Sequence, residues 1–120
     1  YKGRVHFEIM PCVNLKINEL SDDIDKSELL NIIRTEIDKS IYKGYKLYPC
    51  NYIAYDMIHN TDKFLQSDYT NEDKEKFVSY VNNQLGKIDI ETSDEEKEFM
   101  RNMIYTMYSN PLKNKLSVQC

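Results

Sequence analysis

The stretch GYKLYPCNYIAYD, residues 44–56, holds four tyrosines and one proline. With one tyrosine just upstream, the tyrosines fall at positions 42, 45, 48, 52 and 55, three or four residues apart. Side chains at this spacing are neighbours on a helix surface. Pro49 suits the first position of a helix, because its fixed φ already has the helical value. We therefore predict a helix that begins at Pro49 and ends near Asn60.

A longer amphipathic helix is predicted upstream of this one. Asp25 and Glu28 have the spacing of a capping box, which marks a helix start. Gly44 is suited to the left-handed residue that ends many helices. The apolar stripe between them consists of Leu29, Leu30, Ile33, Ile37 and Ile41.

Two further capping boxes predict two helices downstream. Thr70 and Asp73 form the first box, and Ser93 and Glu96 form the second. The helix after the first box has a stripe of Phe77, Val81, Leu85 and Ile88. The helix after the second has an apolar side of Phe99, Met100, Met103, Ile104, Met107 and Tyr108. We interpret this side as core packing, with a pliable binding surface as the alternative, and we expect the helix to stop at Pro111.

Residues 4–10, RVHFEIM, alternate between apolar and polar side chains, which is typical of a half-buried β-strand. No second convincing strand follows, although a strand needs a partner for its backbone groups. We expect the partner either in an N-terminal part of a longer protein or in a second copy, which would give a homodimer through residues 4–10. The predicted fold is mainly α: one strand at about 4–10 and about four helices, with residues 1–20 as strand and loop and 21–120 as a helical extension.

Composition restricts the function. The 120 residues are 41% apolar and 30% charged, as in a folded globular domain. The net charge of −4 is spread along the chain, with 8 Lys and Arg against 9 Asp and Glu in residues 1–60. Nucleic-acid binding needs a basic surface, so we predict no nucleic-acid partner and no base-stacking role for the tyrosines. Three cysteines far apart indicate reduced thiols in the cytoplasm.

The residue chemistry alone predicts no active site, no cofactor and no metal. His6 lies on the polar side of the predicted strand, and His59 closes a predicted helix, where the helix dipole favours it. Both have an ordinary structural interpretation. A zinc site from His6, Cys12 and Cys50 would have no recognisable ligand spacing.

Two stretches, YKGRVHFEIMPCVN (residues 1–14) and IDKSIYKGYKLYPCNYIAYDMI (residues 37–58), resemble the C-terminal part of a bacterial family of lysophospholipid acyltransferases. These are the 1-acyl-glycerol-3-phosphate acyltransferases of Bacteroides-like bacteria. The resemblance covers essentially the whole chain. It is most specific over residues 47–56, and NPLKNKL (residues 110–116) adds a moderate signal.

The resemblance implies that the chain belongs to an α/β enzyme that moves a fatty acyl group from a thioester donor to a lysophospholipid. The family's catalytic motif is a histidine with an aspartate five positions later, the histidine acting as general base. Here the fifth residue after His6 is Pro11 and the fifth after His59 is Phe64. No catalytic residue can be carried over, and the motif is expected upstream of Tyr1. The parent is expected at the cytoplasmic face of the inner membrane, with peripheral membrane contact.

Within the block, the resemblance singles out five residues for a structural or binding role. Asn51 is expected to cap or hydrogen-bond the turn, and Asp56 to pair with a basic group of the missing domain. The tyrosines suit a lipid–water boundary, although we favour packing. The alternative function is a non-catalytic helical protein–protein interaction domain. The five block residues are Tyr48, Pro49, Asn51, Tyr52 and Asp56.

Overall fold

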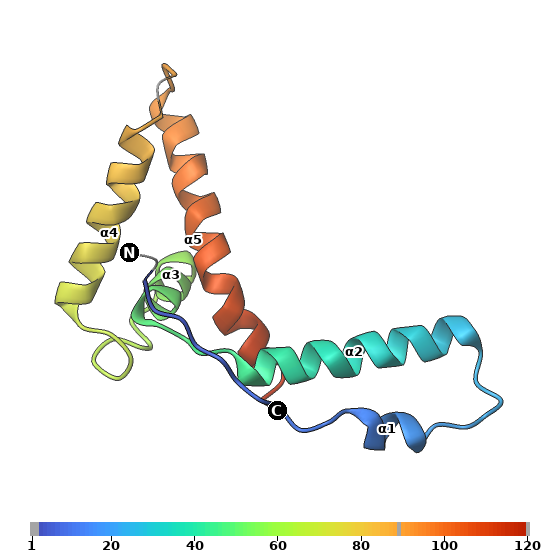
Figure 1. Cartoon of the computed structure of the whole chain (residues 1–120). Helices are drawn as coiled ribbons and strands as arrows, with labels where there is room; N and C mark the ends of the chain where they lie inside the picture. The colour runs from blue at the N-terminus through green and yellow to red at the C-terminus, as the bar shows by residue number, and fades with distance from the viewer. Residues whose placement is uncertain (1–2, 89, 120) are drawn as a thin grey trace. The chain divides into compact units, whose positions relative to one another are not determined.

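The computed structural model describes residues 3–88 and 90–119, without the side chains of residues 15 and 16. Within these ranges the chain is mainly helical, as predicted (Figure 1). The helices are α1 (Asn14–Asn18), α2 (Lys26–Gly44), α3 (Pro49–His59), α4 (Asn71–Gly86) and α5 (Asp94–Ser117). The chain divides into two compact units, one of Tyr1–Lys46 with Lys115–Cys120 and the other of Leu47–Asn114.

The helix predicted after Asp25 is confirmed as α2. The Asp25 carboxylate caps it by accepting a hydrogen bond of 3.1 Å from the Ser27 N–H, and the predicted capping box with Glu28 is not formed. The predicted left-handed Gly44 is wrong, because Gly44 is the last helical residue and the cap is Tyr45 with φ of −57°. The absence of a side chain at Gly44 instead allows a close approach. A Cβ there would lie 3.0 Å from the Met10 sulfur.

The predicted strand over residues 4–10 is not formed, since residues 3–12 have no regular secondary structure. A strand gains its hydrogen bonds from a neighbouring strand. The described part of the chain contains no sheet, only an isolated bridge between Leu65 and Tyr69. The apolar residues of the alternating pattern are therefore left in solvent. Val5, Phe7 and Ile9 are 71%, 88% and 97% exposed.

The unit of residues 47–114 contains the hydrophobic core of the described residues. Ile53 and Ala54 of α3 are almost completely buried, and α3 packs on α4. In Figure 1, α4 and α5 diverge from the loop that joins them, and α3 lies between their far ends. The Phe77 ring of α4 lies 5.9 Å from the Tyr105 ring of α5 and 5.2 Å from the Tyr108 ring. The core cluster consists of Ile53, Ala54, Tyr69, Phe77, Val81, Leu85 and Tyr105.

Both downstream capping boxes are confirmed. The Thr70 hydroxyl accepts from the Asp73 N–H at 3.2 Å while the Asp73 carboxylate accepts from the Thr70 N–H at 2.9 Å. Ser93 and Glu96 make the same reciprocal pair at 3.2 and 3.0 Å, directly before α5. These bonds satisfy N–H groups that have no partner within the helix.

The predicted stop of α5 at Pro111 is wrong, because the helix continues through it to Ser117. Proline removes one helical hydrogen bond and is unfavourable inside a helix. The next residue, Leu112, is only 2% exposed. Its burial, and that of Ser109 one turn before, stabilises the turn around the proline. Tertiary packing therefore overrides the local preference.

The predicted buried side of α5 is correct only in part. Met100, Ile104 and Tyr108 pack against the core. The most buried positions of the helix are instead Tyr105, Ser109 and Leu112. The buried side of α5 is thus rotated relative to the predicted one, and the other half of the apolar stripe is exposed. Phe99, Met103 and Met107 are 65%, 56% and 60% exposed.

We expect Ile53→Ala to lower the free energy of unfolding by about 2–5 kcal/mol, the usual effect of emptying a fully buried aliphatic site. Ile58→Ala on the same helix is the matched control, because Ile58 is 38% exposed. The control should change stability by less than about 1 kcal/mol. Urea denaturation followed by circular dichroism measures both. Equal losses would contradict this assignment of the core.

Candidate functional site

Residues 47–56, which carry the acyltransferase resemblance, form the turn into α3 and most of its length. Asn51 is 8% exposed and makes three hydrogen bonds there. Its N–H donates to the Tyr48 carbonyl at 2.9 Å, and its side-chain oxygen accepts from the Tyr48 N–H at 2.9 Å. Its amide nitrogen donates to the Tyr108 carbonyl at 2.8 Å. Asn51 therefore caps α3, with Pro49 as the first helical residue, and ties it to α5.

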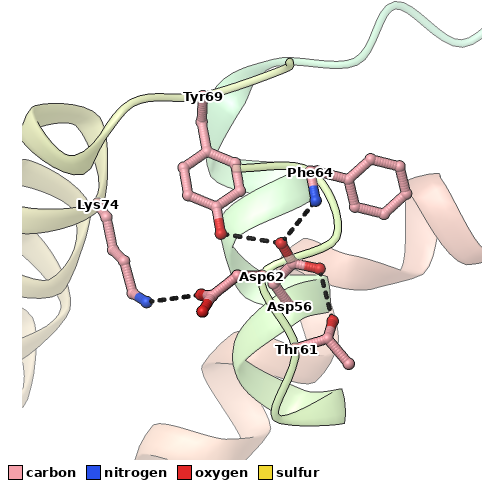
Figure 2. Close-up of polar contacts among 6 residues, drawn as sticks. All are labelled: Asp56, Thr61, Asp62, Phe64, Tyr69 and Lys74. Atoms are coloured by element: carbon pink, nitrogen blue, oxygen red, sulfur yellow. Dashed lines mark hydrogen bonds and ion pairs between the residues drawn. The ribbon is translucent and has the colours of Figure 1, made fainter. Parts of the chain in front are cut away.

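Asp56, in the middle of α3, is 1% exposed and binds the loop that follows the helix (Figure 2). Its Oδ1 accepts a hydrogen bond of 2.9 Å from the Thr61 hydroxyl. Its Oδ2 accepts from the Phe64 N–H at 3.0 Å and from the Tyr69 hydroxyl at 2.8 Å. A buried carboxylate is unfavourable unless it is fully hydrogen-bonded, and these three donors satisfy that requirement.

The donors to Asp56 are neutral groups of the same unit. Lys74 pairs with Asp62 at 3.6 Å, on the exposed side of the loop (Figure 2). A basic group from another domain, the partner suggested for Asp56 by the resemblance, would have to displace these neutral donors from a buried position. The geometry is that of a structural clamp, which we call the Asp56 clamp (Asp56, Thr61, Phe64 and Tyr69).

Two tyrosines of the block pack on the loop held by the Asp56 clamp. The Tyr52 ring is half-buried and lies 5.1 Å from the Phe64 ring. The Tyr55 ring stacks on the His59 ring at 4.1 Å and meets Phe64 edge-on at 5.8 Å. Burial raises the pKa of the Tyr52 phenol. These contacts are the packing that we favoured for the tyrosines.

Each histidine contacts a residue of its own stretch of the chain. His6 contacts Glu8 at 2.9 Å, whereas His59 at the end of α3 bonds the Tyr55 carbonyl at 2.8 Å. Burial raises the pKa of the half-buried Cys50 thiol, which disfavours the reactive thiolate. Over residues 3–88 and 90–119, no three His, Cys, Asp or Glu side chains gather as a metal site would require.

The exposed apolar residues of α5 are the strongest candidate for a functional surface. Phe99, Met103 and Met107 are spaced by four residues and form one row, which we call the α5 row. At its N-terminal end, Phe99 and Met100 line a shallow hollow of about 460 Å³ together with Glu95 and Glu96. The methionine content of this helix was the sequence signal for a binding surface. Which of its residues are exposed became clear only from the packing of α4 and α5.

Comparisons of the chain with family models, with curated proteins and with solved structures found no match. Among the described helices, none combines the length and the apolar character needed to cross a bilayer.

We expect Asp56→Ala to lower the free energy of unfolding by more than about 2 kcal/mol. It leaves the Phe64 N–H and the Tyr69 hydroxyl without an acceptor in a buried place, at about 1–3 kcal/mol for each unsatisfied group. Asp62→Ala is the matched control in the same loop, because its exposed ion pair with Lys74 should contribute less than about 1 kcal/mol. Chemical denaturation measures both variants. A loss for Asp56→Ala no larger than that of the control would rule out the clamp.

We also expect the unit to lose stability at alkaline pH. Burial and the hydrogen bond to Asp56 raise the pKa of Tyr69, and burial and a hydrogen bond to Tyr80 raise that of Tyr108 to about 12. A pKa raised above the unfolded value of about 10 adds stability that is complete below pH 10 and is lost as pH rises through the folded value. Stability should therefore fall between about pH 10 and 12. Denaturation at stepped pH tests this, with a shallower fall expected for Tyr69→Phe and an equal fall contradicting the role of Tyr69.

Proposed function

We propose that this chain is the helical C-terminal region of a bacterial glycerolipid acyltransferase. The enzyme would transfer a fatty acyl group from a thioester donor to a lysophospholipid at the cytoplasmic face of the inner membrane. The observation that supports the proposal is the burial of the polar residues in the block that carries the resemblance. The two polar residues retained in its most specific block, Asn51 and Asp56, are both buried and both hold the unit together.

In this proposal the chain has a supporting role and the chemistry lies elsewhere. Asn51 and Asp56 use their polar atoms on structural partners, and the His-x4-Asp motif is not found after His6 or His59. The exposure of Val5, Phe7 and Ile9 supports a partner for residues 4–10. We propose that the partner is the sheet of the catalytic domain, or a second copy of the segment when that sheet is absent.

A non-catalytic interaction domain is the second candidate function. The specific observation in its favour is the α5 row, since three large apolar side chains side by side on one helix are a typical docking surface. In this case the chain would act through a protein partner without any acyl transfer. A peripheral membrane contact is a further proposal, although Glu95 and Glu96 beside the row disfavour anionic lipid.

We expect the complete reading frame that contains this chain to encode a His-x4-Asp pair upstream. The full-length product should acylate 1-acyl-glycerol-3-phosphate from an acyl thioester, while the 120-residue chain is inactive. Replacing the histidine of that pair with alanine should reduce the rate at least about 10²-fold, the usual contribution of a general base. Release of the free thiol from the thioester donor measures the reaction.

A full-length product that lacks the pair and transfers no acyl group would reject the enzyme and leave the interaction domain. Acyl transfer by the 120-residue chain that is lost in His6→Ala or His59→Ala would instead place the catalytic base inside this chain.

Co-sedimentation with vesicles of phosphatidylglycerol and phosphatidylethanolamine tests the membrane contact. Reduced sedimentation of Met103→Glu relative to the unchanged chain would assign that contact to the α5 row.

A further inference from the structure

The exposed surface of α5 has opposite charges at its two ends and large apolar side chains between them. Glu95 and Lys113 are both exposed, and they are 18 positions apart, five full turns of 3.6 residues. They therefore lie on the same side of the helix. No ion pair within the described residues engages either side chain. The α5 row lies between them, with Phe99 and Met107 at equal distances from Met103.

We propose that two copies of this chain associate through α5, antiparallel to each other, about a two-fold axis beside Met103. A two-fold interface uses the same patch on both subunits, so the patch must be complementary to itself. The α5 surface meets this condition in its charges and in the spacing of its apolar residues. The inference does not rest on the acyltransferase proposal.

The apolar part of the interface follows from the register. With Met103 on the axis, Phe99 meets Met107 of the partner subunit, and Met107 meets Phe99 of the partner subunit. A thioether beside an aromatic ring is a favourable contact, and methionine adapts to the shape of its neighbour. Helices that cross at about 20° remain in contact over several turns, enough for the three residues of the row.

The charged ends of the surface select the antiparallel orientation. In this orientation Glu95 lies near Lys113 of the partner subunit, and the pair occurs twice by symmetry. A parallel pair would place Glu95 near Glu95 of the partner subunit and Lys113 near Lys113 of the partner subunit, which is repulsive. The helix dipoles also oppose each other favourably in the antiparallel pair.

The same charges disfavour other occupants of the α5 row. An anionic membrane would be repelled by Glu95 and Glu96, because helices that lie on membranes carry Lys and Arg on the polar side. A partner with charges of one sign only would meet a like charge at one end of the row, at Glu95 or at Lys113. The interface between two single helices is smaller than the roughly 800 Å² per partner of a standard stable complex. We therefore expect a reversible dimer that depends on concentration.

Sedimentation equilibrium of the 120-residue chain at concentrations up to about 1 mM tests the proposal. The unchanged chain should approach twice its mass of 14.3 kDa. Met103→Glu should give monomer, because two carboxylates would meet at the axis. Glu95→Lys and Lys113→Glu should each raise the dissociation constant about tenfold, since each makes both charged pairs repulsive. The double variant Glu95→Lys with Lys113→Glu restores opposite charges and should recover the dimer.

Circular dichroism shows that each variant keeps its helices, so that loss of the dimer is not loss of the fold. Phe7→Pro removes a backbone N–H and so weakens strand pairing through residues 4–10. A dimer formed through α5 should be unaffected by this variant. An unchanged chain that remains monomeric, or a dimer that Phe7→Pro abolishes and Met103→Glu does not, overturns the proposal. A double charge variant as weak as the two single ones overturns the antiparallel register.

Discussion

The unit of residues 47–114 depends on one buried carboxylate. The Asp56 side chain is almost completely buried, with 1% of its surface exposed. Its carboxylate oxygens accept hydrogen bonds from the loop that leads from α3 to α4. The position of this loop determines where Tyr69 enters the core and where α4 begins. Without acceptors for the Phe64 N–H and the Tyr69 hydroxyl, the loop would lose both hydrogen bonds in a place where water cannot replace them.

Asn51 makes a second polar connection, between α3 and α5. Its side-chain amide joins the start of α3 to the Tyr108 carbonyl of α5, three residues before Pro111. The aromatic contacts of Phe77 with Tyr105 and Tyr108 hold α4 to the same part of α5. Asn51 thus joins α5 to α3, and Asp56 joins the following loop to α3. The apolar core fills the space between these elements. Both polar residues therefore have structural partners within this unit.

The functional interpretation follows from what the core does not cover. The Asp56 carboxylate is buried and accepts three hydrogen bonds from groups of its own unit, which gives the clamp a structural role. The α5 row differs from the clamp, because its side chains are large, apolar and exposed. The same holds for Val5, Phe7 and Ile9 near the N-terminal end. Exposed apolar side chains grouped in this way mark sites of association. The proposed roles therefore concern assembly, with an acyltransferase domain or with a second copy.

The sequence by itself determined most of the helices. Local signals lie within a few residues of each other, and the Asp25, Pro49, Thr70 and Ser93 starts were all predictable from capping chemistry. The short helix α1 had no such signal and was missed. The ends were less predictable, since the Gly44 conformation and the passage of α5 through Pro111 depend on contacts with distant residues.

Tertiary structure alone decided how the side chains of these helices are used. Periodicity gave α5 an apolar stripe but could not show that only half of it packs against the core, because the width of the core surface is not encoded locally. The alternating pattern of residues 4–10 favours a strand, but a strand forms only beside another strand. No described segment of the chain provides that neighbouring strand. For Asp56 the sequence marked a residue of interest. Its partners, five, eight and thirteen positions away, were brought to it by the folded loop.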